Sequence, residues 1–224
     1  MVLLDPRDFV LNDMTPKRLV CCDFDGTITV RETFVAMQEK FSPEKAAQII
    51  PEIYAQRVTL RDGVRQMLEA IPSDKYPEII EFAKTEAIRP GLVELLDFLD
   101  GENVPFVVVS GGLRGMVETT LGKLIDRVQA IYAVDLDTRG EFLRPYSAFE
   151  GSTEMLEKVK VVSQYQIEDW VAIGDSVTDL NMAMAAPLVF ARSRLCQYLD
   201  DRQVSYIPYE DFFDVRDRLS QLWS

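Results

Sequence analysis

The sequence contains no histidine, and this absence restricts the chemistry that the protein can perform. Histidine triads, histidine–zinc sites and a histidine general base are all excluded. Any acid–base catalysis must therefore come from carboxylates, lysine or tyrosine.

Cysteine is also scarce, with 3 in 224 residues, and two of them form the apolar pair Cys21-Cys22. This number and spacing indicate neither a disulfide framework nor a zinc site. We find no apolar run of ~18 residues, the length that spans a membrane. We also expect no signal segment. The cysteines are therefore expected to be reduced core residues of a cytoplasmic protein.

Positive charge is in deficit, because 24 basic residues face 37 acidic ones and the formal net charge is −13. This balance is unsuited to binding nucleic acid phosphates or an anionic membrane, so we expect neither partner. The length fits one domain, or a core with a modest insertion. The sequence is compatible with both a monomer and a homodimer.

The most informative stretch runs from Leu19 to Thr29, where an apolar run leads directly into the motif Asp23-Phe24-Asp25-Gly26-Thr27. A strand that is apolar throughout is typical of the centre of a parallel sheet. Gly26 allows a sharp turn at its carboxyl end, where open α/β sheets place their ligands. Asp23 and Asp25 are thus predicted at the rim of the sheet, with an ordinary acidic loop as the alternative.

Apolar spacing divides the chain into two parts. Over residues 30–87 the spacing is helical, with breaks that predict about four helices, one of them beginning after Thr59. Elsewhere, strands alternate with helices, as in a doubly wound parallel sheet. We therefore predict an α/β core, residues 1–29 and 88–224, with a helical cap inserted over 30–87.

Further elements of the core follow from local patterns. We predict strands over 104–109, 129–134, 170–173 and 188–190, a hairpin turn at 138–140, and helices over about 153–165, after Arg192 and from about Tyr209.

Three strands are predicted to end in polar loops that contain glycine, and these loops begin at Asp23, Ser110 and Gly174. Taken singly, Ser110 could cap a helix and Asp175 could occupy a turn. Taken together on one edge of a parallel sheet, the loops predict a ligand site. The carboxylates would repel one another without a cation, which indicates Mg²⁺. The Ser110 hydroxyl and backbone N–H groups suit phosphate oxygens.

Such a phosphate site needs a positive charge, for which Lys158 and Lys160 are the candidates. A solvated helix face is the ordinary alternative. Apolar residues follow Lys158 three, four and seven positions later, which places it on or beside the side facing the sheet. We therefore predict that Lys158, and not Lys160, belongs to the site.

These motifs, in this order, resemble those of the haloacid dehalogenase-like phosphatases, over nearly the whole chain from Arg18. The resemblance implies that Asp23 is a nucleophile that forms an aspartyl-phosphate. It implies that Asp25 protonates the leaving oxygen and later activates water. It also implies a Mg²⁺ ion held by Asp23, the backbone carbonyl of Asp25 and Asp175, with Asp179 in support.

The same resemblance assigns phosphate binding and closure of the site. Ser110, Gly111 and Lys158 are expected to bind the phosphoryl oxygens, and the helical insertion to close over a small phosphate ester. Two non-enzymatic alternatives are a phospho-acceptor receiver module, which needs neither the cap nor Asp25, and a silent binding protein. The latter is expected to have lost a site residue, and none is lost.

The spacing is most similar to the phosphoserine phosphatase branch of the family. Glu32 and Thr33 match a Glu-Thr pair used near the substrate amine, although a glutamate at a helix start is also expected without such a role. Where that branch has an arginine for the substrate carboxylate, this chain has Met67, which argues against an amino-acid phosphate. A shift of register would place Arg65 there instead.

Four segments, 22–29, 174–179, 190–192 and 207–212, resemble the methionine-salvage phosphatases that act on 2-hydroxy-3-keto-5-methylthiopentenyl 1-phosphate. That family also has methionine at the position of Met67. The chain departs from it before Lys158, where it lacks a cysteine-rich insert. We therefore expect a Mg²⁺-dependent phosphatase of such a substrate, with a phosphoserine phosphatase or another small-metabolite phosphatase as the alternative.

Overall fold

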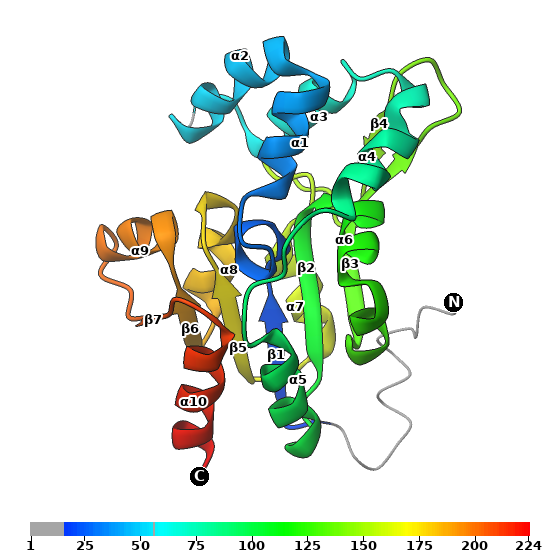
Figure 1. Ribbon diagram of the computed structural model, residues 1–224. Helices are drawn as coiled ribbons and strands as arrows, with labels where there is room; N and C mark the ends of the chain where they lie inside the picture. The colour runs from blue at the N-terminus through cyan, green and yellow to red at the C-terminus, as the bar shows by residue number, and fades with distance from the viewer. Residues whose placement is uncertain (1–15, 56) are drawn as a thin grey trace.

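The structure is a computed structural model that describes residues 16–55 and 57–224, so residues 1–15 of the expected core lie outside it. A central sheet carries helices on both faces, and a group of helices lies above one end of its strands (Figure 1). The sheet has seven strands in the order β4-β3-β2-β1-β5-β6-β7. The strands are β1 Arg18–Cys22, β2 Phe106–Leu113, β3 Ala130–Asp137, β4 Arg144–Tyr146, β5 Asp169–Gly174, β6 Leu188–Ala191 and β7 Ile207–Pro208.

Strand β1 occupies the centre of the sheet, as its apolar sequence predicts. Strand β1 pairs in parallel with β2 and β5. Among the strand pairs of the described residues, β3–β4 is antiparallel. Alternate residues of β1 face opposite layers: Val20 and Cys22 lie in one apolar cluster, and Leu19 and Cys21 in another. The doubly wound sheet is thereby confirmed.

The helices cover the two faces and the carboxyl ends of the strands. Helices α5 and α10 pack on one face, and α7 packs on the other. The α-helices are α1 Thr33–Phe41, α2 Pro43–Tyr54, α3 Leu60–Leu68, α4 Tyr76–Ala83, α5 Leu92–Gly101, α6 Arg114–Leu121, α7 Lys158–Val162, α8 Leu180–Ala185, α9 Ser193–Asp200 and α10 Phe212–Trp223. Short turns of other helix types are η2 Phe24–Ile28, η3 Ser73–Lys75, η4 Gly122–Arg127, η5 Ser163–Tyr165 and η6 Val177–Asp179.

The insertion, residues 30–87, contains helices α1–α4, which agrees with the four helices expected. Helix α3 begins as predicted, because the Thr59 hydroxyl accepts a hydrogen bond of 3.0 Å from the N–H of Asp62. The insertion is tied to the β3–β4 hairpin by backbone hydrogen bonds, from Leu143 N–H to the carbonyl of Ile71 at 3.0 Å and from Ser73 N–H to the carbonyl of Glu141 at 2.9 Å.

The helix predicted over 153–165 is wrong in its first five residues, because α7 begins only at Lys158. The preceding segment is held by tertiary contacts: Met155 and Leu156 are buried in the core, and the N–H of Glu157 donates to the carbonyl of Phe149 at 2.9 Å. These contacts outweigh the helical spacing of the segment.

Other boundaries also differ from the predictions. Strand β2 continues past residue 109 to Leu113 with irregular pairing, so Ser110 lies within its last residues. The final helix begins at Phe212 instead of near Tyr209, because the Asp211 side chain caps it by accepting from the N–H of Phe213. Strand β7 has only two residues and was not predicted.

Within the described ranges, no helix has the length and apolarity required to cross a membrane.

The glycines at the two ends of α5 test where the backbone requires glycine. Gly91 has a φ of +83°, and a methyl group there would collide with the backbone nitrogen of Phe213 on α10. We expect Gly91→Ala to lower the free energy of unfolding by at least ~1 kcal/mol. Gly101, at the other end of the helix, has open space beside it, and Gly101→Ala should change stability by less than ~1 kcal/mol. Urea unfolding measures both, and equal losses would contradict this role of Gly91.

Candidate active site

The carboxyl ends of three neighbouring strands meet at one edge of the sheet. Because β1 lies between β2 and β5, the residues that end these strands are adjacent in space. Asp23 follows β1, Ser110 lies near the end of β2, and Asp175 follows β5. Each is at most 3% exposed. The structure thus brings together the three loops that the sequence analysis selected.

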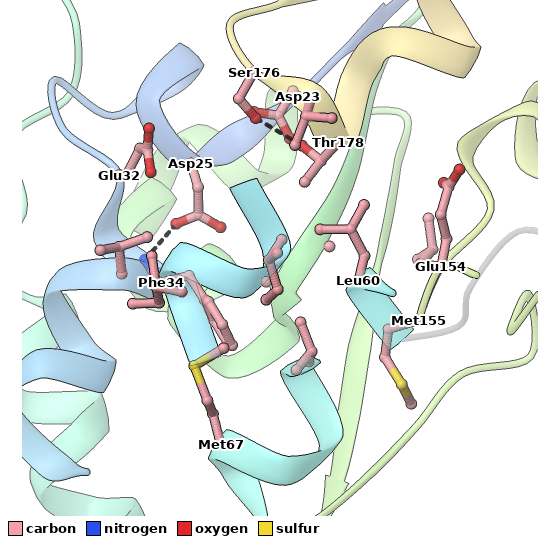
Figure 2. Close-up of a pocket in the computed structure, with 18 of the residues that line it drawn as sticks. Asp23, Asp25, Glu32, Phe34, Leu60, Met67, Glu154, Met155, Ser176 and Thr178 are labelled. Atoms are coloured by element: carbon pink, nitrogen blue, oxygen red, sulfur yellow. Dashed lines mark hydrogen bonds between the residues drawn. The ribbon is translucent and has the colours of Figure 1, made fainter. Parts of the chain in front are cut away.

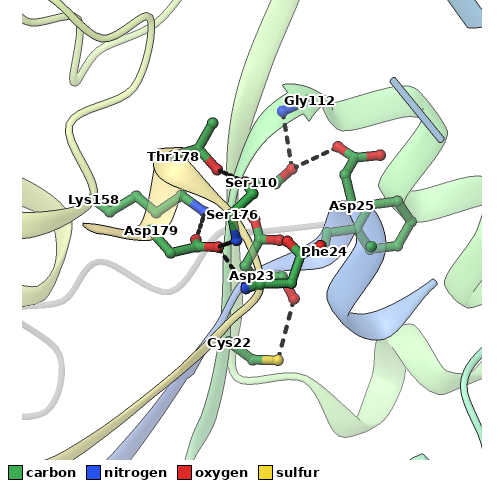
Figure 3. A network of polar contacts seen from close by, with 12 residues as sticks. Cys22, Asp23, Phe24, Asp25, Ser110, Gly112, Lys158, Ser176, Thr178 and Asp179 are labelled. Atoms are coloured by element: carbon green, nitrogen blue, oxygen red, sulfur yellow. Dashed lines mark hydrogen bonds and ion pairs between the residues drawn. The ribbon is translucent and has the colours of Figure 1, made fainter. Parts of the chain in front are cut away.

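A sharp turn after β1 places Asp23 and Asp25 (Figure 3). Gly26 has a φ of +77°, and a Cβ atom there would collide with the carboxylate of Asp175. The buried Arg89 guanidinium holds this turn by donating to the backbone carbonyls of Gly26 at 2.7 Å and Thr27 at 2.8 Å. The turn is therefore fixed by glycine at its bend and by an arginine that the sequence analysis did not select.

Lys158 lies at the centre of the site. Its Nζ is 2.5 Å from Oδ1 of Asp23 and 2.6 Å from Oδ1 of Asp179, and its side chain is 2% exposed. Lys160 instead points to the surface, where its Nζ is 2.8 Å from Oε2 of Glu157. The expected choice of Lys158 over Lys160 therefore agrees with the geometry, although Lys158 is the first residue of α7 and not part of a longer helix.

Burial and charge act in opposite directions on this cluster. Burial would lower the pKa of the Lys158 ammonium, but Asp179 and Asp23 raise it above its usual range, so the lysine is protonated. Burial, together with the charge of Asp179, raises the pKa of the Asp23 carboxyl to about 7 against the effect of Lys158. The site therefore holds more negative charge than its one lysine offsets.

The carboxylates of Asp23, Asp175 and Asp179 can hold a metal ion, because each offers an oxygen and these oxygens lie within 4.8 Å of one another. Oδ2 of Asp23 and Oδ1 of Asp175 are buried and have no hydrogen-bond partner. Burial and the charge of Asp23 raise the pKa of Asp175 to about 9. Unpartnered, mutually repelling oxygens fit a hard divalent cation such as Mg²⁺.

Asp179 differs from the other two, because both of its oxygens have partners. Oδ1 contacts Lys158, and Oδ2 accepts from the N–H groups of Asp175 at 2.9 Å and Ser176 at 3.1 Å. Its contacts orient the lysine and the loop after β5.

The Asp25 carboxyl lies between the core and the insertion. Its Oδ1 accepts hydrogen bonds from the hydroxyl of Thr33 and, at 3.0 Å, from the N–H of Phe34 at the start of α1. Burial raises its pKa to about 7, and the hydrogen bond from Phe34 acts in the opposite direction. A carboxyl with this pKa can both give and take a proton near neutral pH.

Ser110 is fully buried, and its hydroxyl accepts from the N–H of Gly112 at 2.9 Å. The same oxygen lies 3.4 Å from Oδ2 of Asp25. Gly111, which lies between Ser110 and Gly112 in sequence, lines the pocket above the site. The predicted phosphate-binding loop therefore lies beside Asp25 and lines the same pocket as both aspartates of the first motif.

A pocket between the core and the insertion opens onto these groups (Figure 2). Its walls include Glu32 and Met67 of the insertion, both selected from the sequence. Most of the remaining wall is apolar: Phe34, Val35, Ile50, Ile53, Leu60, Val64, Met155, Leu156 and Val177. Arg65 is not part of this lining; its Nη2 is 2.7 Å from Oε1 of Glu150. The alternative register that would bring Arg65 to the substrate is therefore not supported.

The sequence analysis did not select four polar residues of the pocket, Tyr54, Glu154, Ser176 and Thr178. The last two lie in the loop after β5, whose aspartates it did select. The Tyr54 hydroxyl donates to Oε2 of Glu32 at 2.6 Å. Glu154 is 7% exposed and accepts a hydrogen bond from Asn181. Tyr54 is the last residue of α2 and belongs to no motif, and Glu154 lies in the segment whose apolar spacing wrongly predicted a helix, so neither carried a local signal.

Comparisons with known proteins agree with this arrangement. Residues 20–184 match the family model described as haloacid dehalogenase-like hydrolase. A 2-hydroxy-3-keto-5-methylthiopentenyl-1-phosphate phosphatase of Microcystis aeruginosa is 50% identical over 204 residues, which cover 90% of this chain and 97% of that protein. One of Bacillus cereus is 33% identical over 215 residues, with coverage of 91% and 96%.

The fold also matches a solved structure. A phosphoserine phosphatase from T. onnurineus superposes with a TM-score of 0.71 at 14% identity, over 92% of this chain and 96% of that one. At this identity, the likeness concerns the fold alone.

The pairing of Lys158 predicts a large and pH-dependent effect on stability. In the presence of a metal chelator, Lys158→Met should lower the free energy of unfolding by ~3–5 kcal/mol at pH 8, because Asp23 and Asp179 remain buried without a cation. The loss should be smaller at pH 5. When folding raises the pKa of a carboxyl group, that group contributes stability at low pH. The contribution is lost as the pH rises through the pKa of the folded state, which is about 7 for Asp23 in the native protein.

Urea unfolding at the two pH values measures this effect. Lys160→Met, on the same helix but 53% exposed, is the matched control and should change stability by no more than ~0.5 kcal/mol. Equal losses for the two variants would contradict the buried pairing.

Proposed function

The chain belongs to the haloacid dehalogenase-like hydrolases, and we propose that it is a Mg²⁺-dependent phosphatase that forms an aspartyl-phosphate on Asp23. One observation carries this proposal: the buried Asp23 carboxylate contacts Lys158 through one oxygen and has no partner on the other. An unpartnered carboxylate oxygen of a residue that lines a pocket is available to attack phosphorus.

In the first half-reaction, an oxygen of Asp23 attacks the phosphorus and the bond to the leaving oxygen breaks. Asp25 gives its proton to that oxygen, so the alcohol leaves neutral. Lys158, Ser110 and the backbone at Gly111 bind the other phosphoryl oxygens and offset their charge. In the second half-reaction, Asp25 takes a proton from water, the water oxygen attacks the phosphorus, and phosphate leaves Asp23 as a free carboxylate.

Asp23, Asp175 and the backbone carbonyl of Asp25 would hold Mg²⁺, with Asp179 in support through Lys158 and the loop backbone. When bound, the ion supplies positive charge that offsets the carboxylates and the phosphoryl oxygens. The unpartnered Oδ1 of Asp175 supports this assignment. Asp23, Asp175 and Asp179 each offer one oxygen, and these oxygens lie within 4.8 Å of one another.

Residues 30–87 act, in this proposal, as a cap over the site. Helices α1–α3 supply Phe34, Ile50 and Val64 to the pocket wall above the catalytic edge. A cover of this kind excludes water during the first transfer. Neither a receiver module nor a silent binding protein requires such a cover together with Asp25.

The proposed substrate is 2-hydroxy-3-keto-5-methylthiopentenyl 1-phosphate, the compound in the names of the two relatives, which belongs to methionine salvage. Its uncharged methylthio tail suits the apolar wall and Met67, and Glu32 can accept a hydrogen bond from a hydroxyl or enol. Phosphoserine is a weaker candidate, because no arginine is present in the lining that the described residues form.

Replacing the proposed nucleophile tests the mechanism. Asp23→Asn should lower kcat by ~10³-fold or more, because an amide cannot attack phosphorus. The far-ultraviolet circular dichroism spectrum should stay native. Asp169→Asn, at the opposite end of β5, is the control and should keep its activity. Near-native phosphate release by Asp23→Asn would refute the assignment of the nucleophile.

Removing the metal is a second test. Exhaustive chelation should abolish phosphate release, and Mg²⁺ should restore it. Ca²⁺ should inhibit, because its longer and looser coordination misplaces the Asp23 carboxylate. Undiminished turnover of the chelated protein would exclude the metal from the mechanism.

Substrate preference is tested by comparing two esters. The methylthiopentenyl phosphate should be hydrolysed with a kcat/KM at least ~10²-fold above that of phosphoserine, whose carboxylate would be buried without a cation. Met67→Arg should narrow this gap by supplying that cation. Equal kcat/KM values for the native protein would contradict the substrate assignment and leave the phosphatase chemistry untouched.

A further inference from the structure

The end of helix α2 meets the core at a contact that the phosphoryl chemistry does not use. The guanidinium carbon of Arg194 lies 4.0 Å from the centroid of the Tyr54 ring. Tyr54 is the last residue of α2, and Arg194 is the second residue of α9 in the core. A guanidinium at this distance makes a cation–π contact with the ring. The contact therefore joins the cap to the core.

Tyr54 also connects this contact to the pocket. Its hydroxyl donates to Oε2 of Glu32 at 2.6 Å, and both residues line the pocket. Burial and the adjacent Glu32 raise the pKa of the Tyr54 hydroxyl above its usual range, so it keeps its proton as a donor. This fixes one oxygen of Glu32 and leaves the other available for a ligand.

Arg194 is positioned by the catalytic edge. The N–H of Leu195 donates to the carbonyl of Asp175 at 2.8 Å, and the N–H of Arg192 donates to the carbonyl of Gly174 at 3.2 Å. Between them, Ser193 has a φ of +49°, a conformation that residues other than glycine seldom adopt. Helix α9 thus starts directly on the end of β5, at a fixed position relative to the site.

The contact lies on the other side of the cap from the β3–β4 hairpin. In Figure 1, α2 extends over α9, whereas α4 lies beside the β3–β4 hairpin on the other side. The hairpin side is held by the backbone hydrogen bonds of Ile71 and Ser73 described above. On the α2 side, the cap and the core meet through the side chains of Tyr54 and Arg194. The nearest backbone hydrogen bond from the cap to the core on this stretch of chain comes from the N–H of Arg61, at the start of α3, to the carbonyl of Thr153 at 2.8 Å.

We propose that Tyr54 and Arg194 are positioning residues that close the α2 side of the pocket and orient Glu32 toward a hydroxyl of the phosphate ester. Arg194 holds the Tyr54 ring, the Tyr54 hydroxyl holds one oxygen of Glu32, and the other oxygen of Glu32 accepts from the substrate hydroxyl. Without Arg194, the Tyr54 ring loses the cation–π contact that holds it against the core. The inference rests on the proposed function, because it assigns a substrate contact to Glu32.

Steady-state kinetics with two substrates test this role. The methylthiopentenyl phosphate carries a hydroxyl donor in its organic part, and p-nitrophenyl phosphate carries none. For Tyr54→Phe, the loss of kcat/KM on the first ester should exceed the loss on the second by roughly 3- to 10-fold. A general loss of structure would affect both esters equally, and that result would overturn the proposal.

A double-mutant cycle tests whether Arg194 acts through the ring. Arg194→Ala should reduce kcat/KM on the hydroxyl-bearing ester by roughly 3- to 10-fold in the native background and cause no further loss in a Tyr54→Ala background. Arg194→Lys should restore part of the activity. Arg57→Ala is the matched control, because Arg57 follows the same helix but pairs with Glu52, with 2.7 Å between its Nε and Oε2 of Glu52. Arg57→Ala should leave kcat/KM unchanged on both esters. Additive losses in the cycle would refute the coupling between Arg194 and Tyr54.

Hydrogen exchange tests the contact without turnover. Arg194→Ala should speed amide exchange in the last turn of α2 and leave α4 unchanged, and identical exchange in the native protein and the variant would overturn the proposal. If the native protein released no phosphate from either ester, the proposed function would fail. The exchange result would still test the contact between Tyr54 and Arg194 independently.

Discussion

The rest of the site depends on the ammonium group of Lys158, which lies between two buried carboxylates. Its contacts with Asp23 and Asp179 connect the end of β1, the start of α7 and the loop after β5. Asp179 extends this connection, because its second oxygen accepts from the backbone at Asp175 and Ser176. One buried cation thus orients the proposed nucleophile and the loop that carries a second carboxylate. Because both partners are buried, the lysine is costly to remove.

The same arrangement leaves negative charge and unpartnered oxygens at the strand ends, and the proposed chemistry depends on this excess. Oδ2 of Asp23 and Oδ1 of Asp175 have no hydrogen-bond partner. In the proposed function, the first is available to the phosphorus and the second to a cation. The pocket wall above them is mostly apolar. Such a wall favours an uncharged tail and excludes water. In the proposed function, the core supplies the phosphoryl chemistry, and the insertion supplies the selection of the leaving group.

Local patterns were sufficient where a residue's environment follows from its neighbours in sequence. The apolar run before Asp23 predicted the central strand, and the apolar spacing after Lys158 predicted its inward direction. Prediction failed where tertiary contacts decide. Met155 and Leu156 have helical spacing, yet their segment is held by the Phe149 carbonyl and by burial, so the helix begins later. The contact of Tyr54 with Arg194 joins helices that are distant in sequence, and no local pattern encodes it.

The central claim is that Asp23 carries the phosphoryl group during turnover. It is tested most directly by acid-quenching the protein during hydrolysis of a phosphate-labelled substrate and mapping the label by peptide mass spectrometry. The account predicts an alkali-labile acyl phosphate on Asp23, formed and consumed at rates compatible with turnover. A label on another residue, or phosphate release with no phosphorylated protein at any quench time, would contradict it.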